Sequence, residues 1–373
     1  MADRQEDVHV RRLSVIELED ARCTVALFRD PVEAARAARL RYVSESMPGI
    51  RRVRLDRDFA YFMPNGEPVR QPERLNRIRA LSIPPAWESV WICPSPRGHI
   101  QATGKDRKSR KQYRYHVRFR LLRDETKFAR MIDFGRSLPS LRRRVEEDLS
   151  RPGMPREKVI ATCVRILDTS YVRVGNTVYV RQNESFGLTT LRVDHVAVSE
   201  DGLHFKFRGK AGKEHDIDVR DPRLISIIKG LQELPGQTLF HYLDGAGRLR
   251  NVESADVNRY LRQTTGHDFT AKDFRTWAGT VLAARELSRL GPFKTEAQAR
   301  RNVAQAIRRV ASTLGNTPAV CRKSYVHPTV VEGYLAGRHA EACQDEEESC
   351  EEAVLALLER QARARYIPST GTG

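Results

Sequence analysis

Residues 191–219, LRVDHVAVSEDGLHFKFRGKAGKEHDIDV, decide the fold of this chain. Apolar and polar side chains alternate in residues 191–198 and again in 203–207, which is typical of strands that bury one face. Asp201-Gly202 is a turn signal between the two runs, and Gly209-Lys210-Ala211-Gly212 is a second one, after which the chain returns. The stretch predicts a three-stranded antiparallel sheet with a lysine at an exposed tip.

Helices are expected on both sides of this sheet, because apolar residues recur there at intervals of three and four positions. The helix after the sheet has Asp221 as its N-cap and Pro222 at its first position. Another helix opens with a capping box, Thr295-x-x-Gln298, and closes at Gly315. The apolar positions of the four helices span residues 159–167, 224–234, 274–282 and 303–314.

The pattern is different in residues 50–100. Short β-like runs alternate there with turn signals such as Pro64-Asn65-Gly66 and Pro84-Pro85, and one helix is expected near residues 73–81. We therefore predict an α+β protein, with a small β-rich N-terminal domain and a larger, mainly α-helical domain that contains the three-stranded antiparallel sheet. The predicted division is an extension at 1–47, the β-rich domain at 48–123, the helical domain at 124–345 and an acidic, then helical, accessory tail at 346–373.

The composition favours a polyanionic partner. Among 373 residues, Lys and Arg number 65 against 48 Asp and Glu, which gives a net charge of +17 and a pI near 9.9. Such an excess points first to nucleic acid and second to an acidic membrane surface. No apolar run is long enough to span a bilayer, and the first residues, MADRQEDVHVRR, are too polar for a signal peptide. We therefore expect a cytoplasmic, nucleoid-associated protein without a membrane partner.

The cysteine pattern argues against two kinds of site. No two cysteines have C-x-x-C spacing, so neither a zinc site nor a redox motif is predicted, and we expect no metal. Because the chain has no export signal, we expect free thiols in a reducing cytoplasm. No Walker A loop is present, so the sequence does not support the use of ATP. The six cysteines are Cys23, Cys93, Cys163, Cys321, Cys343 and Cys350.

The most basic stretch runs from residue 104 to residue 130, GKDRKSRKQYRYHVRFRLLRDETKFAR. Aromatic residues are interleaved with its cations, which favours a surface that grips phosphates and packs rings on sugars or bases. A solvated basic face is the alternative. Tyr113 and Tyr115 would share one face of a strand, which suits either DNA or a core. The candidate DNA-binding residues here are Lys105, Arg110, Lys111, Tyr113 and Tyr115.

Four motifs follow one another in the remaining sequence. They are Tyr171-Val-Arg-Val-Gly-Asn176, Phe207-Arg-Gly-Lys210, Lys272-Asp-Phe-Arg275 continued by Thr-Trp-Ala-Gly, and Leu314-Gly-Asn-Thr-Pro318 followed by Cys321-Arg-Lys-Ser-Tyr325. Each motif alone is a weak signal, because basic residues are common in this chain. In this order they are similar to the motifs of type IB DNA topoisomerases of the poxviral and bacterial branch, and residues 104–116 resemble the DNA-clamping part of that family. The resemblance covers roughly residues 40–337.

The resemblance implies a role for each motif. Tyr325 would attack the scissile phosphate of DNA and hold a 3′-phosphotyrosyl linkage, which leaves a 5′-hydroxyl. Arg173 and Arg275 would contact the non-bridging phosphate oxygens, and Lys210 would protonate the 5′ oxygen. Asn316 stands where the poxviral enzymes have a histidine and bacterial relatives have asparagine. Its amide can donate a hydrogen bond to a phosphate oxygen but carries no charge.

These residue types fit that chemistry. A tyrosine is a poor nucleophile at neutral pH, because its ordinary pKa is about 10, and it therefore needs cations nearby. The planar fork of arginine donates two hydrogen bonds to one phosphate. A lysine on a mobile tip can act as an acid if neighbouring cations lower its pKa. Ala211 departs from the poxviral motif, which has an acid beside the lysine, and we assign it no role.

The resemblance also implies how the whole protein works. Its two domains would clamp duplex DNA, and the enzyme, as a monomer, would relax supercoils by nicking, rotation and religation. The phosphotyrosine conserves the bond energy, so neither ATP nor a metal is required, although Mg²⁺ can speed turnover by weakening product binding. Tyr179 and Lys272 are two further candidate DNA contacts.

Two alternative functions stay open at this stage. A tyrosine site-specific recombinase uses the same chemistry on a related catalytic domain. Recombinases usually carry His-x-x-Arg where this chain has Lys272-Asp-Phe-Arg275, and their N-terminal domain is normally helical. A non-enzymatic basic DNA-binding protein is permitted by the composition alone, and the test is whether Tyr325 becomes covalently attached to DNA.

Overall fold

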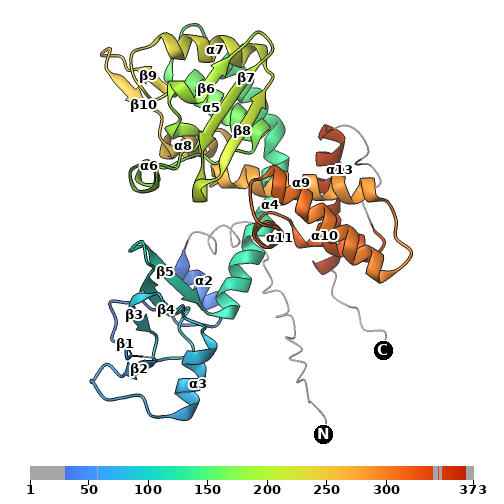
Figure 1. Ribbon diagram of the computed structural model, residues 1–373. Helices are drawn as coiled ribbons and strands as arrows, with labels where there is room; N and C mark the ends of the chain where they lie inside the picture. Colours follow the sequence, from blue (N-terminus) through green and yellow to red (C-terminus); the bar gives the residue numbers. More distant parts are fainter. Residues whose placement is uncertain (1–29, 57, 339–342, 344–346, 367–373) are drawn as a thin grey trace. The chain divides into compact units, whose positions relative to one another are not determined.

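The computed structural model describes residues 30–56, 58–338, 343 and 347–366. The chain folds into two compact units, residues 1–130 and 131–373, called unit 1 and unit 2 below (Figure 1). The division falls within helix α4 (Val117–Leu149), downstream of the boundary predicted at residue 123. Residues 1–29 of the predicted extension lie outside the described residues, and its described part holds helix α2 (Pro31–Ala37). None of the helices in the described part is long and apolar enough to cross a membrane.

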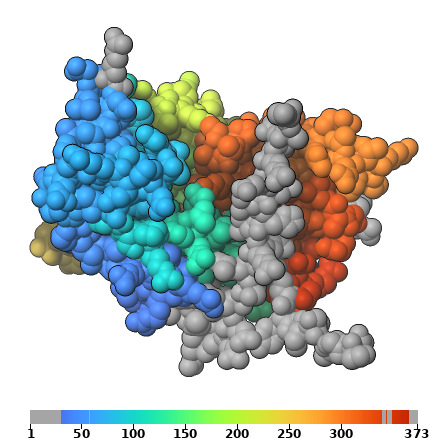
Figure 2. Space-filling model, turned by 90° about the horizontal axis from the view of Figure 1, so that it is seen from below, coloured from blue at the N-terminus to red at the C-terminus, as the bar shows by residue number. Residues whose placement is uncertain are grey.

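Unit 1 is built on a five-stranded antiparallel sheet in the order β2-β1-β3-β4-β5. Helix α3 (Pro72–Ala80) contributes Ile78 to one core with Ile50 and Ile92 of the sheet. The small β-rich domain predicted from the turn signals is confirmed, and its outer surface appears in blue in Figure 2. The strands are β1 (Ile50–Arg54), β2 (Phe59–Phe62), β3 (Glu88–Ile92), β4 (Ile100–Lys105) and β5 (Lys111–Tyr115).

Asp106 organises the turn between β4 and β5. Its carboxylate accepts hydrogen bonds from the backbone N–H groups of Lys108 at 2.9 Å and Arg110 at 3.0 Å. The side chain of Arg110 also donates to it, and this bond is the main reason why the pKa of Asp106 falls to about 2. An aspartate that bonds the backbone ahead of it is a common turn former, so the basic residues around it stand on a defined hairpin.

Unit 2 is mainly α-helical and has one hydrophobic core. Its central element is α9 (Ala271–Leu290), which is buried along most of its length and packs against α5, α8, α10, α12 and α13 (Figure 1). The four helices predicted from apolar spacing are confirmed as α5, α7, α9 and α10, with N-caps at Asp221 and Thr295 as expected. Besides α9 and the end of α4, the helices are α5 (Arg156–Ser170), α6 (Thr177–Asn183), α7 (Pro222–Glu233), α8 (Ser254–Thr265), α10 (Glu296–Thr313), α11 (Pro318–Ser324), α12 (Pro328–Leu335) and α13 (Glu347–Tyr366).

The three-stranded antiparallel sheet is confirmed in the order β6-β7-β8. The predicted extent of its first strand is wrong, because β6 covers only Val196–Val198 and residues 193–195 form a short 3₁₀ turn, η2. Within this turn, Nδ1 of His195 accepts a hydrogen bond from the backbone N–H of Arg192 at 3.1 Å, a local bond that competes with strand pairing. The other strands are β7 (Leu203–Arg208) and β8 (Glu214–Val219), and the sequence did not predict the small hairpin of β9 (His241–Leu243) and β10 (Leu249–Asn251).

The C-terminal helix α13 is an integral part of unit 2. Its side chains Cys350, Val354 and Leu358 are buried in the same core as α9. The carboxylate of Glu351 accepts a hydrogen bond from Nε1 of Trp277 at 2.9 Å. The helix that the sequence suggested as an accessory tail therefore supports the central helix directly.

A disulfide joins Cys343 to Cys350, with Cα atoms 4.3 Å apart. The expectation that all cysteines are free thiols is therefore wrong for this pair. Their spacing in sequence is not diagnostic, and the fold brings them together where the chain enters α13. Cys93, Cys163 and Cys321 are free and buried, as expected, and Cys23 lies outside the described residues.

Candidate active site

Arg275 projects from the second turn of α9 and is held by two backbone carbonyls. Nη2 donates to the carbonyl oxygen of Leu314 at 2.7 Å, and Nη1 donates to the carbonyl oxygen of Tyr171. The residue is only 4% exposed, and no carboxylate forms an ion pair with it in the described part of the chain. The guanidinium is thus fixed in place without being neutralised, which keeps its charge available for an anion.

Arg173 lies in the segment that joins α5 to α6. Tyr171 ends α5 in the left-handed conformation, with φ of 57°, which turns the chain so that its carbonyl meets Arg275. Nη2 of Arg173 donates to Oδ1 of Asn316 at 2.6 Å, whereas the buried Nη1 has no acceptor among the described residues. Burial lowers the pKa of Arg173, the cation of Arg275 lowers it further, and Tyr325 raises it. The two arginines and Tyr325 therefore share one region.

Asn316 follows helix α10, and hydrogen bonds at both polar atoms of its side-chain amide orient it. Oδ1 accepts the hydrogen bond from Arg173, and Nδ2 donates to the carbonyl oxygen of Leu314 at 3.3 Å. The same carbonyl accepts from Arg275, so one backbone oxygen links Asn316 to α9. An amide nitrogen carries two hydrogens, and one of them remains for a further acceptor.

Tyr325 is the C-cap of the short helix α11. Thr317 caps this helix through a hydrogen bond from the N–H of Val320, and Pro318 occupies its first position. The carbonyl oxygen of Tyr325 accepts from the hydroxyl of Thr280 on α9 at 3.3 Å, and the Cζ of Arg275 lies 5.0 Å from the centroid of its ring. One helix therefore positions both a cation and the candidate nucleophile.

The backbone of Tyr325 also packs tightly on α9 at Gly279. A Cβ atom at position 279 would lie 2.6 Å from the carbonyl oxygen of Tyr325 and 2.9 Å from its Cβ. Only glycine permits this approach, because real side chains do not tolerate such distances. In the sequence, Gly279 is part of the motif that begins at Lys272, but the motif alone does not reveal this close approach.

Lys210 stands at the exposed tip between β7 and β8, in the short turn η3 (Lys210–Gly212), as predicted. Among the described residues, no hydrogen bond or ion pair joins Lys210 to Arg173, Arg275, Asn316 or Tyr325. The structure thus groups four of the five predicted catalytic residues and leaves the lysine on a separate hairpin. His215 lies between that hairpin and the turn of Asn316. The sequence marks His215 only as the first residue of a predicted strand, and β8 places it opposite Phe207.

The predicted DNA-binding residues of unit 1 stand together on the β4–β5 hairpin, and all of them are exposed. The rings of Tyr113 and Tyr115 stack with centroids 5.7 Å apart and planes 11° from parallel. Lys111 pairs with Glu45 at 2.6 Å and Arg110 with Asp106 at 2.7 Å, while Lys105 is exposed at the end of β4. In unit 2, Tyr179 is exposed on α6 and Lys272 is exposed in the first turn of α9.

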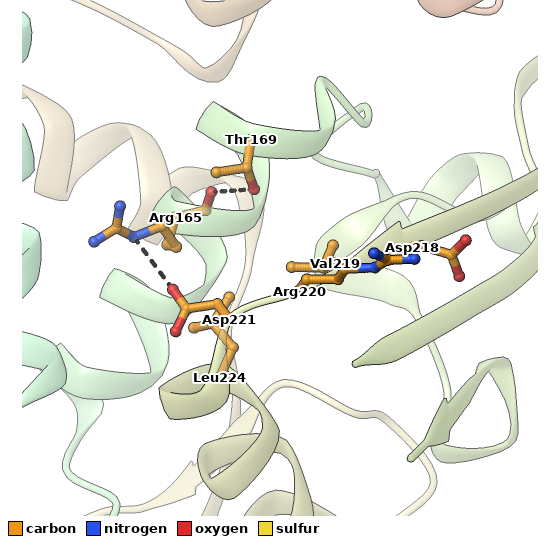
Figure 3. Close-up of a pocket in the computed structure, with 7 residues that line it drawn as sticks. All are labelled: Arg165, Thr169, Asp218, Val219, Arg220, Asp221 and Leu224. Atoms are coloured by element: carbon orange, nitrogen blue, oxygen red, sulfur yellow. Dashed lines mark hydrogen bonds and ion pairs between the residues drawn. The ribbon is translucent and has the colours of Figure 1, made fainter. Parts of the chain in front are cut away.

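A cavity of about 160 Å³ in unit 2 contains none of these residues (Figure 3). Within it, Nε of Arg165 lies 4.0 Å from the carboxylate of Asp221, so its charges compensate one another. The candidate active site is therefore not this cavity. The cavity is lined by Arg165, Thr169, Asp218, Val219, Arg220, Asp221 and Leu224.

Comparison with known proteins identifies the family. Residues 111–353 match the family described as eukaryotic DNA topoisomerase I, catalytic core, and residues 58–106 match the bacterial DNA topoisomerase IB N-terminal domain. DNA topoisomerase 1B of Acanthamoeba polyphaga mimivirus is 35% identical over 286 residues, which are 75% of this chain and 85% of that protein. DNA topoisomerase 1B of Vaccinia virus (strain Copenhagen) is 22% identical over 235 residues, 61% of this chain and 70% of the relative. With three motif residues grouped around Tyr325 and matches over both units, the chain belongs to the type IB DNA topoisomerases.

Proposed function

We propose that Tyr325 is the nucleophile of this type IB DNA topoisomerase. Its phenolate oxygen forms a bond to phosphorus in one DNA strand while the bond from phosphorus to the 5′ oxygen breaks, and the 5′ oxygen takes up a proton. After rotation about the intact strand, the 5′-hydroxyl attacks the phosphotyrosine and restores the original bond. One phosphoester replaces another in each step, so the cycle consumes no ATP. This reaction, rather than recombination or passive DNA binding, is the one that family membership favours.

The observation that carries this proposal is the grouping of Tyr325 with two arginines. The Cζ of Arg275 lies 5.0 Å from the centroid of the Tyr325 ring, and Arg173 is close enough for Tyr325 to affect its pKa. Two cations therefore stand beside the group that attacks the phosphate. The same charge stabilises the additional negative charge that develops on the phosphate in the transition state.

Arg173 is proposed as a direct phosphate ligand because it has an unused donor. Its buried Nη1 finds no acceptor in the part of the chain that the structure describes, and a buried donor without an acceptor is unfavourable by about 1–3 kcal/mol. A non-bridging phosphate oxygen would supply the missing acceptor. The terminal nitrogens of Arg275 already donate to the carbonyl oxygens of Leu314 and Tyr171. Their remaining hydrogens would bind the phosphate.

Lys210 and Asn316 complete the proposed machinery. Lys210, on its exposed tip, delivers the proton to the 5′ oxygen, a role that needs a group able to reach the leaving atom. Asn316 orients Arg173 through Oδ1 and donates its remaining N–H to a phosphate oxygen. It therefore contributes alignment rather than charge.

DNA binding is proposed to use both units. The hairpin that carries Lys105, Arg110, Lys111, Tyr113 and Tyr115 would contact the backbone and bases, and Tyr179 and Lys272 would contact DNA from unit 2. On binding DNA, Lys111 would release Glu45 and Arg110 would release Asp106, and each cation would pair with a phosphate instead. Binding that rests on phosphate contacts falls steeply with salt. We further propose that the enzyme works as a monomer on chromosomal DNA in the cytoplasm, without a metal cofactor, and that Mg²⁺ only accelerates product release.

Plasmid relaxation in EDTA without ATP tests the proposal. The wild type should relax supercoils, and Tyr325→Phe should bind DNA without relaxing it. Tyr242→Phe, which removes the hydroxyl of another tyrosine in unit 2, is the matched control and should stay active. After denaturation, a nucleotide adduct on Tyr325 should be found by mass spectrometry. Relaxation by Tyr325→Phe, or an adduct on a different residue, would refute the assignment.

A further inference from the structure

The ring of His215 packs on the hairpin that carries Lys210. His215 on β8 is paired with Phe207 on β7, and the two rings stack with centroids 5.0 Å apart and planes 13° from parallel. A Cβ atom at Gly209 would clash with Cδ2 of the imidazole and lie 2.6 Å from Nε2. The imidazole therefore covers the backbone of the residue that immediately precedes Lys210.

Another edge of the same ring reaches the turn that carries Asn316. A Cβ atom at Gly315 would lie 3.3 Å from Cε1 of His215 and 4.0 Å from Nε2. Asn316, the next residue, accepts the hydrogen bond from Arg173. One imidazole thus touches the neighbour of the proposed acid and the neighbour of a phosphate-binding residue, although the two segments are far apart in sequence.

The surroundings of His215 favour its neutral form. Burial lowers the pKa of His215, and the cations of Arg173, Arg275 and Lys213 lower it further, whereas Glu214 raises it. These charged groups come from the segment after α5, from α9 and from the hairpin itself. Within the described residues, no hydrogen bond to either ring nitrogen of His215 is found. The contact therefore depends on the shape of the ring and on its lack of charge.

We propose that His215 is a positioning residue that fixes the Lys210 hairpin against the Asn316 turn and so sets where Lys210 delivers its proton. This inference rests on the proposed role of Lys210 as the acid. An aromatic ring of the same shape should satisfy the contact, because it can stack on Phe207 and lie over Gly209. Protonation should weaken the contact, because it places a third cation beside Arg173 and Arg275.

The first test separates positioning of the acid from general stability. Wild-type protein is used to map a cleavage site in a duplex, which is then made with oxygen or sulfur as the 5′ leaving atom. Sulfur leaves without protonation, so it bypasses the acid. On the oxygen substrate, His215→Ala should cleave roughly 100-fold more slowly than wild type at unchanged DNA affinity, the effect expected of a small misplacement of a catalytic group. On the sulfur substrate, both His215→Ala and Lys210→Ala should recover.

The second test uses conservative variants and pH. His215→Phe should cleave the oxygen substrate at close to the wild-type rate. As the pH drops below the ordinary histidine pKa of about 6.5, the wild-type rate should fall more steeply than that of His215→Phe, because only the wild type has a ring that gains charge there. His204→Ala is the matched control, because His204 is exposed on the same sheet and bonded to Asp218, and it should behave as wild type.

The outcomes distinguish the two hypotheses. If Lys210→Ala recovers with sulfur and His215→Ala does not, the role of His215 is overturned while Lys210 remains the acid. If neither variant recovers, both proposals fail together. Wild-type cleavage by His215→Ala, or an equally steep fall of the rate at acidic pH in wild type and His215→Phe, would also overturn the inference.

Discussion

The side chains of Arg173 and Asn316 are joined by a hydrogen bond of 2.6 Å from Nη2 to Oδ1. The bond fixes one terminal nitrogen of the guanidinium, and the other, the buried Nη1, has no acceptor within residues 30–56, 58–338, 343 and 347–366. In the proposed reaction, Asn316 would act on the phosphate in two ways, by aligning Arg173 and by donating its own N–H. These two contacts would allow an uncharged residue to serve at this position.

Substitutions of Asn316 should separate its effect on the alignment of Arg173 from the effect of a charge at this position. Asn316→Ala removes a hydrogen bond to a charged group, worth about 1.5–3 kcal/mol, so single-turnover cleavage should slow by about 10-fold to 100-fold. Asn316→Asp should be slower still, because its carboxylate neutralises Arg173 and repels the phosphate. Asn316→His should retain activity. Cleavage by Asn316→Asp at the wild-type rate would contradict the proposed contact.

Gly279→Ala should displace the nucleophile without harming the helix. The new Cβ would lie 2.6 Å from the carbonyl oxygen of Tyr325, while alanine is intrinsically favourable in a helix. We expect cleavage to slow by about 100-fold at unchanged DNA affinity, measured by adduct formation and by gel shift. Gly245→Ala, where the new Cβ meets nothing within 4 Å, is the control. Normal cleavage by Gly279→Ala would show that Tyr325 is not seated on α9.

Glu351 should stabilise unit 2 rather than act on DNA. It accepts hydrogen bonds from Trp277 at 2.9 Å and from Arg142 at 2.7 Å, and Arg142 also binds Asp168 at 2.8 Å. Glu351→Ala should lower the free energy of unfolding by about 2–3 kcal/mol, because it leaves two donors unpaired. Thermal unfolding measures the change.

A control for this prediction lies on the same helix. Glu359 pairs with Arg136, whose side chain is 55% exposed, so Glu359→Ala should change the stability by less than about 1 kcal/mol. Removal of residues 347–373 should destabilise unit 2 as well, because it deletes the buried Val354 and Leu358. Full stability of the truncated protein would contradict the view that α13 belongs to the core.

Lys111→Ala should reveal the phosphate contacts of unit 1. Each lysine that neutralises a phosphate changes the slope of log affinity against log salt by about one. We therefore expect weaker binding and a shallower slope by about that amount in a fluorescence titration. Lys229→Ala removes the same charge at an exposed position of α7 outside the predicted contacts and should leave the slope unchanged. Equal effects of the two variants would indicate a response to net charge alone.

Glu45 provides the complementary variant. Its carboxylate holds Lys111 in the DNA-free protein, and the hydrogen bond from Lys111 is the main cause of its lowered pKa. Glu45→Gln should tighten DNA binding at low salt, because phosphate no longer competes with a carboxylate for Lys111. Weaker binding by Glu45→Gln would mean that the ion pair organises the hairpin for DNA.

Much of this protein could be predicted from the sequence, because the signals are local. The alternation in 203–207 and the Gly-Lys-Ala-Gly tip depend only on neighbouring residues, and the structure confirms both. Helix caps such as Asp221 and Thr295 are also local. The family was predicted from motif order, which needs no knowledge of contacts. Local reasoning was wrong at residues 193–195, where His195 bonds the backbone of Arg192 instead of continuing a strand.

Only the tertiary structure decided which groups meet. The sequence identified Arg275, but its carbonyl partners at Tyr171 and Leu314 lie 104 and 39 positions away along the chain. Three further features also come from the tertiary structure and not from a local pattern. They are the place of His215 between two turns, the close contact of Tyr325 with Gly279, and the Cys343–Cys350 disulfide. Hydrophobic periodicity fixes which face of a helix is buried but not which helix it meets, because burial is non-directional. The sequence therefore determined the residue types of this site, and the packing around α9 determined how they are aligned.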